Sequence, residues 1–383
     1  MEGPRACRPE ELPALRQLVD RVFRQGSENS LVDEFPILFN EANCRHLRVM
    51  VEDGRPVSCI NYVIRPVVIY GNLLVVGSLG AVSTYEEYRG RGLATTLLQD
   101  TFAEMRREKV DVVLISGQRG LYQRAGCAIG GHEMRFSLDR QGLERVDAGR
   151  EVAVAEATDA DIPDLIAIHQ IEPARYIRSP WDWQQFLKVC RLVTKGVEPP
   201  FGARRCWLVA SHDRLLAYVV LAVARDRDAP TAGVVEFGGS RRAVIAALRV
   251  LAERYRLQAI SARVLPEDRE ALAMLEALGV AAEPHLLGGH RLAILHEHIL
   301  SRYRPWLTER VGPEAAAAIE VRRRDAVWSL EVRGKTVPVG DFEALNVALF
   351  GDTVRDLAGG GEAAALLRRA LPLPWVLPGL NYV

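Results

Sequence analysis

The stretch Tyr88-Arg89-Gly90-Arg91-Gly92-Leu93-Ala94 decides how the N-terminal third of this chain folds. It joins an apolar, strand-like segment, Val75 to Tyr85, to an amphipathic segment that predicts a helix running to about Lys109. A loop that feeds a helix presents several backbone N–H groups together with the positive end of the helix dipole. Gly90 and Gly92 let this backbone approach a ligand closely, and the two arginines add positive charge. The pattern predicts a diphosphate site at the start of this helix.

As letters alone, this pattern is weak, and the chain contains a second match to it, Gln123-Arg124-Ala125-Gly126-Cys127-Ala128. The second match is followed by Ile129-Gly130-Gly131, which does not continue as an amphipathic helix. The structural context therefore favours the loop from Arg89 to Ala94.

Composition excludes a global attraction to polyanions. The 383 residues contain 49 Lys plus Arg and 49 Asp plus Glu, so the net charge is zero, and 49% of the residues are hydrophobic. We expect a globular protein with no nucleic-acid or membrane partner. The N-terminus lacks an apolar targeting segment, which favours a cytoplasmic location. The oligomeric state stays open, a homo-oligomer included.

The sequence gives no reason to expect a metal site. The six cysteines are scattered, without a CxxC pair, so neither a zinc site nor a disulfide framework is indicated. His296 and His298 lie near His285 and His290, but no carboxylate spacing completes a ligand set.

An internal echo indicates two tandem α/β units. Glu11-Leu12-Pro13-Ala14-Leu15 returns as Asp161-Ile162-Pro163-Asp164-Leu165, and in both copies a short run leads into a helix with proline in its first turn. From about Leu292 the pattern changes to a helix near Ile299 to Arg310 and short strands, which predicts a third, α+β domain.

The expected elements repeat in order along the two units. The first unit has predicted strands at Arg45–Glu52, Pro56–Ile69, Val75–Tyr85 and Val112–Ile115. The second has predicted strands at Cys206–Ala210, Leu215–Ala224, Val234–Phe237 and Ile260–Val264, with helices at Arg241–Tyr255 and Asp268–Leu278. The third domain has predicted strands at Ala317–Val321, Ala326–Val332 and Lys335–Val339, helices at Asp341–Leu349 and Glu362–Ala370, and a proline-rich tail at Leu371–Val383.

On these residues the chain resembles the GNAT N-acetyltransferases, whose signature Q/R-x-x-G-x-G/A lies between a strand and a helix and holds acetyl-CoA. Ala81-Val82-Ser83-Thr84 resembles the family's cofactor-facing strand, and Leu121 to Gly126 resembles its short helix, where a tyrosine faces the cofactor sulfur. The resemblance implies acetyl-CoA as cosubstrate. It implies cofactor contacts from Val82, Ser83, Thr84, Arg89, Gly90, Arg91, Gly92, Leu93, Ala94, Thr95, Ser116, Gly117 and Tyr122.

The overall plan is similar to that of the enhanced intracellular survival (Eis) acetyltransferases. That resemblance implies an α/β (α+β) fold with a catalytic GNAT domain at 1–145, a degenerate GNAT-like domain at 146–288, and a sterol-carrier-like α+β domain at 289–383 with a docked tail. It also implies that Tyr122 is the general acid and that the carboxylate of Val383 is the base. A phenol, with a pKa near 10, is close enough to a thiol to return a proton to it. The stiff, apolar tail favours docking of the chain end.

We therefore expect an acetyl-CoA-dependent N-acetyltransferase, in which a primary amine attacks the thioester directly in a ternary complex. The acceptor is expected to be aminoglycoside-like, a polyamine or of lysine type, and the alternative is a non-catalytic, acyl-CoA-responsive binding protein. Asp33, Glu34 and Phe35 are candidates for acceptor contact, and the alternative is a solvated acidic turn. Gly238 to Arg242 lacks the required spacing and predicts a degenerate loop, while Trp181 and Trp183 either border the acceptor cleft or form a packed helix face.

Overall fold

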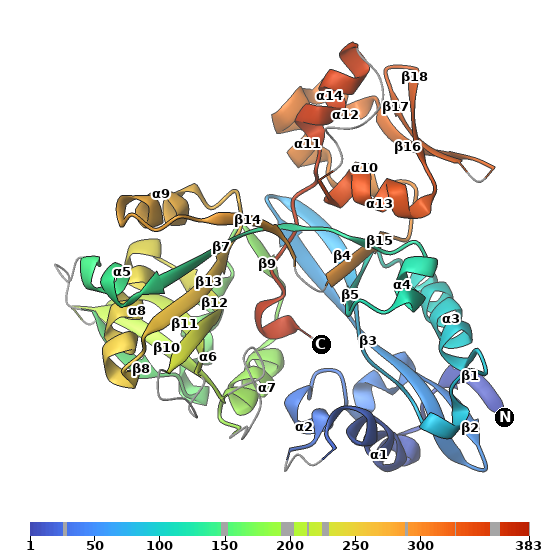
Figure 1. The fold of residues 1–383 in the computed structure, drawn as a ribbon, viewed down its shortest axis with the longest axis horizontal. Helices are drawn as coiled ribbons and strands as arrows, with labels where there is room; N and C mark the ends of the chain where they lie inside the picture. The colour runs from blue at the N-terminus through green and yellow to red at the C-terminus, as the bar shows by residue number, and fades with distance from the viewer. Residues whose placement is uncertain are drawn as a thin grey trace.

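The computed structural model describes residues 1–25, 29–146, 152–192, 203–212, 214–223, 230–287, 290–325, 327–352 and 361–382. These residues form a mixed α/β structure around three sheets (Figure 1). Two large sheets lie in the lower part of Figure 1, and the third, small sheet lies above them with most of the C-terminal helices.

The first sheet has eight described strands, in the order β1-β2-β3-β4-β5-β15-β6, with β9 paired to β3. Its strands are β1 (Glu2–Ala6), β2 (Leu47–Glu52), β3 (Arg55–Ile69), β4 (Asn72–Thr84), β5 (Val112–Ser116), β6 (Ala128–Ile129), β9 (Ala174–Tyr176) and β15 (His290–Ile294). Its helices are α1 (Leu12–Phe23), α2 (Leu31–Glu34), α3 (Leu93–Arg107) and α4 (Gly120–Arg124). The predicted central strands and the predicted helix after the glycine loop are confirmed, whereas β1, β6, β9 and β15 have no counterpart in the sequence prediction.

The second sheet has seven described strands, in the order β14-β7-β13-β12-β11-β10-β8. They are β7 (His132–Asp139), β8 (Ala153–Glu156), β10 (Ala203–Ser211), β11 (Arg214–Val223), β12 (Thr231–Gly239), β13 (Ala259–Val264) and β14 (Glu283–Leu286). The accompanying helices are α5 (Arg140–Arg145), α6 (Ile162–His169), α7 (Pro180–Cys190), α8 (Arg241–Tyr255) and α9 (Arg269–Ala277).

The repeated sequence segment, Glu11–Leu15 and Asp161–Leu165, corresponds to a repeated structural motif. Each copy starts with a short strand, β1 or β8, and a 3₁₀ turn, Pro9–Glu11 or Asp159–Asp161. The turn leads into α1 or α6, each with proline in the first turn. The predicted relation between the two units is confirmed at this point.

The two large sheets exchange strands. β7 follows β6 directly in the chain but lies between β13 and β14 of the second sheet. In return, β15 lies between β5 and β6 of the first sheet, with Arg291 opposite both Ile115 and Ile129. β7 comes before the expected boundary at 145/146 but belongs to the second sheet, and β15 comes after the expected boundary at 288/289 but belongs to the first. The exact domain limits stay a prediction.

The third sheet consists of β16 (Ile319–Arg324), β17 (Val327–Val332) and β18 (Lys335–Gly340). Its helices are α10 (Ile299–Arg302), α11 (Arg304–Val311), α12 (Pro313–Ala317), α13 (Phe342–Phe350) and α14 (Glu362–Ala370). Two local predictions were wrong here. The helix predicted over Ile299–Arg310 is divided at Tyr303, because Pro305 starts a new helix, and Ala317 ends the helix that Pro313 starts instead of beginning a strand.

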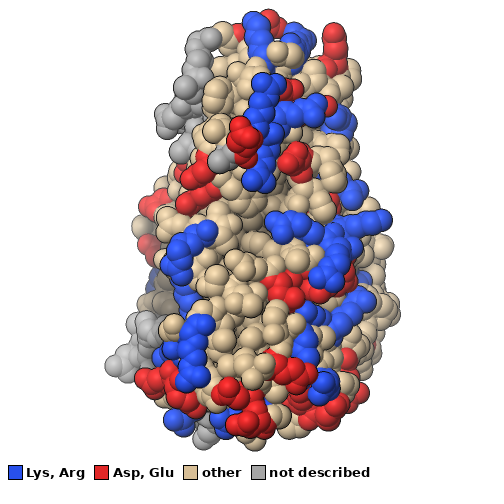
Figure 2. All heavy atoms as spheres, turned by 90° about the vertical axis from the view of Figure 1, so that its right-hand side faces the viewer, with Lys and Arg blue, Asp and Glu red and all other residues tan. Residues whose placement is uncertain are grey.

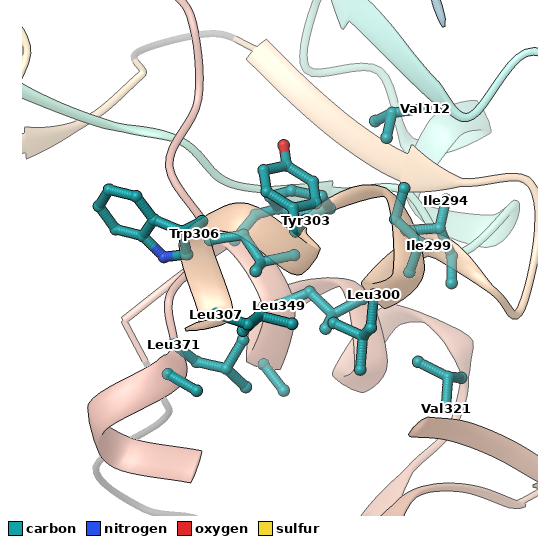
Figure 3. Close-up of a cluster of buried hydrophobic side chains, with 14 of the residues drawn as sticks. Val112, Ile294, Ile299, Leu300, Tyr303, Trp306, Leu307, Val321, Leu349 and Leu371 are labelled. Atoms are coloured by element: carbon teal, nitrogen blue, oxygen red, sulfur yellow. The ribbon is translucent and has the colours of Figure 1, made fainter. Parts of the chain in front are cut away.

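One apolar core joins the third domain to the first sheet. Val112 and Ile294 of the first sheet belong to the same buried cluster as Leu300, Leu307 and Leu349 (Figure 3). Because these side chains lose their contact with water only when both parts are in place, each part stabilises the other. The tail then leaves this core and runs down to the middle of the molecule, where the C-terminus lies (Figure 1).

We expect the first sheet to depend on β15. A fragment of residues 1–130 should be stabilised when residues 290–295 are appended through a short glycine-serine linker, since β6 and β15 are adjacent and antiparallel. Ala293 and Leu295 face the first unit's own core and become buried there, and a buried leucine side chain contributes about 1.5–3 kcal/mol. Urea unfolding should show a gain of about 2 kcal/mol. Equal unfolding midpoints with and without the appended strand would contradict the exchange.

Candidate active site

The loop before α3 has the backbone that its glycines require. Gly90 and Gly92 have φ angles of 77° and 76°, in the left-handed region, and a Cβ at either would meet no atom within 4 Å. Gly92 is the N-cap of α3. In the described part of the chain, the N–H groups of Gly90, Gly92 and Ala94 have no hydrogen-bond acceptor. These donors are available to an anion.

A pocket of about 600 Å³ opens at this loop. Its lining comprises Val22, Val82, Thr84, Tyr88, Arg89, Gly90, Gly92, Leu93, Ala94, Thr95, Arg119, Leu121 and Arg124. Eight of the predicted cofactor residues are in this lining, and three arginines contribute positive charge. No role is assigned to Arg119 or Arg124 from the sequence, although Arg124 lies in the same short helix as Tyr122.

Arg91, the other arginine of the loop, is not among the residues that line this pocket. Its guanidinium is over the ring of Tyr88, 4.8 Å from the ring centroid, and it donates to the carbonyl of Glu87 at 2.9 Å. Figure 2 faces the side of the molecule that carries α3 and α4, and positive and negative side chains are interspersed over it. Neither sign of charge dominates this face, and the positive charge at the pocket comes from Arg89, Arg119 and Arg124.

The two parallel strands behind the pocket diverge. β4 and β5 pair only from Val76–Val112 to Leu79–Ile115, while β4 continues to Thr84 alongside β3. Ala81, with φ of 50°, marks the irregularity in β4. Val82, Ser83 and Thr84 therefore lie on the part of β4 that has moved away from β5.

The end of this strand is held in place by local hydrogen bonds. The hydroxyls of Thr84 and Ser58 are 2.7 Å apart. Arg119 donates to the carbonyl of Val82 at 3.3 Å, so this arginine spans the opening between β4 and the segment after β5.

Tyr122 lies on the β5 side of the opening. It is in the short helix α4 and is buried, 3% exposed, in the cluster that also contains Leu93 and Leu97. A Cβ on Gly117, at the end of β5, would lie 3.4 Å from the Tyr122 ring. Burial raises the pKa of Tyr122 to about 12, against a weaker opposing effect of Arg119. At neutral pH the phenol keeps its proton.

The chain end approaches the same strand end. The Tyr382 side chain is hydrogen-bonded to Ser116, the last residue of β5, and its ring makes an edge contact with His290 at 5.4 Å between centroids. Val383, the predicted base, is outside the described residues. Ser116, Gly117 and Tyr122 from the first unit thus lie near Tyr382 from the tail.

The three residues considered for acceptor contact have partners within the first unit. Asp33 accepts from Arg16 at 2.8 Å, and Glu34 is buried and ion-paired with Arg24. Phe35 is part of the apolar core. Their role in acceptor binding stays a prediction.

The corresponding loop of the second unit is occupied by a carboxylate of the protein itself. Glu172 accepts from the Gly239 N–H at 2.7 Å and from both terminal nitrogens of Arg241, at 2.8 and 2.6 Å. Arg241 also binds Asp268 at 2.7 Å. An internal anion uses the donors at the start of α8, which supports the interpretation of this loop as degenerate.

The tryptophans and histidines considered in the sequence analysis make contacts within the protein. Trp183 is fully buried, with Arg178 stacked on its ring at 4.8 Å, whereas Trp181 is 43% exposed. His296 and His298 stack on each other at 4.9 Å. Among the described residues, no group of three His, Cys, Asp or Glu side chains could hold a metal ion, and no helix is long and apolar enough to cross a membrane. Location and oligomeric state stay predictions.

Comparison with known proteins agrees with the geometry of the first unit. Residues 4–130 match the family model of the GNAT acetyltransferase domain. No curated protein matches the chain in sequence.

Solved structures resemble the whole chain. A GCN5-related N-acetyltransferase from Anabaena variabilis is 14% identical with a TM-score of 0.65, covering 97% of this chain and 98% of that one. A probable N-acyltransferase from Enterococcus faecalis is 13% identical with a TM-score of 0.64, covering 97% and 96%. Eis1 from Mycobacterium abscessus is 15% identical with a TM-score of 0.61, covering 95% and 94%.

At these identities the structural likeness establishes the fold, while the family model identifies the N-terminal unit. The chain therefore contains a GNAT acetyltransferase domain in residues 4–130, within a fold that it shares over nearly its whole length with Eis1 and the other N-acetyltransferase structures.

Proposed function

We propose that the protein transfers the acetyl group of acetyl-CoA to a primary amine, by direct attack in a ternary complex. The pocket at the N-terminus of α3 carries this proposal, because it combines free backbone donors, left-handed glycines and arginines at one point. The diphosphate of the cosubstrate fits these donors, and the opening between β4 and β5 fits its extended arm. Backbone N–H groups near Thr84 would stabilise the charge that develops on the thioester oxygen.

The proton transfers are assigned to the hydroxyl of Tyr122 and to the C-terminal carboxylate. As the amine nitrogen bonds to the acetyl carbon, the C-terminal carboxylate of Val383 accepts the proton that the amine loses. As the carbon–sulfur bond breaks, the Tyr122 hydroxyl gives its proton to the departing thiolate, and solvent returns a proton to the phenolate. The raised pKa of Tyr122 and the hydrogen bond between Tyr382 and Ser116 support these assignments.

The direct test incubates the purified protein with acetyl-CoA and a panel of aminoglycosides, polyamines and lysine-bearing peptides. The expected result is release of free CoA with formation of an N-acetylated product from at least one class. Cofactor binding by calorimetry without transfer to any of them would instead indicate the non-catalytic, acyl-CoA-responsive binding protein. A protein that does not bind acetyl-CoA would rule out both.

Gly92→Ala should weaken acetyl-CoA binding. Alanine is strained at φ of 76° and displaces the backbone donors at the start of α3. We expect the Kd for acetyl-CoA to rise by about tenfold or more, as for the loss of a charge-assisted hydrogen bond. Gly71→Ala is the matched control, because Gly71 has φ of 81° and equally open surroundings in the turn between β3 and β4. Equal effects of the two variants on the Kd would show that the loop does not contribute to acetyl-CoA binding.

Tyr122→Phe should reduce turnover without weakening cofactor binding. Loss of a general acid lowers kcat by about 10²- to 10⁴-fold, while the ring still fills its place in the buried cluster. Tyr62→Phe is the control, since Tyr62 is a fully buried tyrosine of the same cluster. An unchanged kcat in Tyr122→Phe would exclude the residue as the acid.

The pH dependence should reflect the raised pKa of Tyr122. A group with a pKa of about 12 stays protonated throughout the usual assay range. The wild-type kcat should therefore show no fall from loss of this proton between about pH 7 and 10. An alkaline decrease in this range that disappears in Tyr122→Phe would contradict the assignment.

Two alanines appended after Val383 should move the terminal carboxylate away from the amine. We expect kcat to fall by about tenfold or more, because proton transfer depends on a fixed distance between the groups. The same two residues added before Met1 serve as the control. An unchanged kcat in the C-terminally extended protein would show that the terminal carboxylate is not the base.

A further inference from the structure

The second unit has the same opening between parallel strands as the first. β12 and β13 pair only from Thr231–Ala259 to Gly233–Ser261, and β12 then continues to Gly239 beside β11. In the first unit the corresponding opening is where we place the cosubstrate. The second opening contains a different occupant.

That occupant is the C-terminal tail of the chain. Val376, Leu377 and Gly379 line the same small cavity, of about 70 Å³, as residues of the diverging part of β12 and of the end of β13. Leu380 in the tail is buried in a cluster that includes Tyr218, Val220 and Val235 of the second sheet. The segment from Val376 to Leu380 therefore covers this opening, and its apolar contacts favour docking through the hydrophobic effect.

A buried ion pair of the second unit fixes the tail backbone. Arg178 donates two hydrogen bonds to the carboxylate of Glu236, at 2.6 and 2.7 Å. The second oxygen of Glu236 accepts from the backbone N–H of Leu380 at 2.9 Å, and Arg178 donates to the side-chain oxygen of Asn381 at 2.7 Å. Each partner of the pair thus also holds one tail residue.

The surroundings of the pair keep it ionised and oriented. Tyr218 donates to Glu236 at 2.8 Å, and His169 is 3.0 Å from the Tyr218 hydroxyl. Burial alone would raise the pKa of Glu236, but Arg178 outweighs it and holds the value at about 2. Burial lowers the pKa of His169 to about 4, so this ring is neutral at physiological pH. Removal of one member of such a buried ion pair destabilises the protein, because the other charge stays buried without its partner.

Gly379 makes the close approach of the tail to Glu236 possible. Its φ is 52°, and a Cβ at this position would lie 2.0 Å from a carboxylate oxygen of Glu236. Only glycine combines this conformation with this contact. The tail sequence is therefore matched to the second unit at one defined point.

We propose that the second GNAT-like unit is the receptor for the chain's own C-terminal tail, with Arg178, Glu236 and Gly379 as positioning residues for the chain end. The strand opening that would take a cosubstrate arm takes residues 376–381, and Glu172 takes the place of the anion at the start of α8. The part of this inference that concerns turnover depends on the proposed function, in which the carboxylate of Val383 is the base.

The positioning follows from chain geometry. Only Tyr382 separates Asn381, held by Arg178, from Val383, and Tyr382 is itself held by Ser116 of the first unit. The tail is thus anchored as far as Tyr382, at the end of β5, and a residue spans at most about 3.6 Å, so the proposal keeps the terminal carboxylate within one residue of this anchor. Loss of the Glu236 anchor should release the chain end without touching the cofactor loop.

The experiment compares Gly379→Ala and Glu236→Gln with two matched controls. Gly334→Ala has the same kind of strain, with φ of 74° in the turn between β17 and β18, and no contact with the tail. Glu11→Gln alters another buried carboxylate that accepts two hydrogen bonds from one arginine, Arg5, and one from a backbone N–H, that of Arg8. For each protein, hydrogen exchange of peptides from residues 371–383, kcat and the acetyl-CoA Kd are measured.

In Gly379→Ala and Glu236→Gln, we expect the exchange rate at the tail to rise by about tenfold or more, because local opening becomes easier. We expect kcat to fall by a similar factor, with the Kd for acetyl-CoA within about twofold of wild type. The controls should leave all three quantities near wild type. Near-ultraviolet circular dichroism verifies that each variant is folded.

Unchanged tail exchange in Gly379→Ala would overturn the proposal even if Glu236→Gln fails to fold. Released tails with unchanged kcat would overturn the positioning role while leaving the docking. If the wild-type protein transfers no acetyl group, the proposed function fails, and the exchange measurements still decide whether the second unit binds the tail.

Discussion

The structure depends on a constraint that acts twice: two parallel strands stop pairing part of the way along, and the backbone groups and apolar walls exposed there need a partner. In the first unit, β4 and β5 separate after Leu79–Ile115, next to the N–H groups of Gly90, Gly92 and Ala94, which have no acceptor among the described residues. In the second, β12 and β13 separate after Gly233–Ser261, and the protein supplies both the anion and the chain segment. One architecture thus yields a ligand site and a docking site.

This difference explains how the second unit has the same strand opening without the glycine-loop signature of the first. Glu172 and Arg241 form an ion pair at the start of α8, so the protein itself neutralises the charge of Arg241 in this loop. Its ion pair of Arg178 and Glu236 is oriented toward the tail. A buried pair of this kind contributes specificity of docking more than net stability, since burial of both charges offsets much of their attraction.

Much of the fold could be predicted from local sequence signals. The glycine loop, the amphipathic helix after it and the repeated proline-initiated helices all depend on nearby residues, and the structure contains them. β7 and β15 could not be assigned to their sheets, because strand partners distant in the chain leave no periodic trace. The same holds for the site: Gly90 and Gly92 were visible as letters, whereas the contact of Tyr382 with Ser116 depends on the whole tertiary structure.

The strand exchange also determines when the protein can become functional during its synthesis. β5 and β6 of the catalytic sheet receive β15 between them only after Ile294 has been made, and the tail contacts form last of all. At about 5–20 residues per second, on the order of ten seconds separates the completion of the first unit's own strands from the arrival of β15. Until then the apolar edge of β5 is open, so nascent chains are exposed to aggregation, and a ribosome that stops early releases a product without an assembled site.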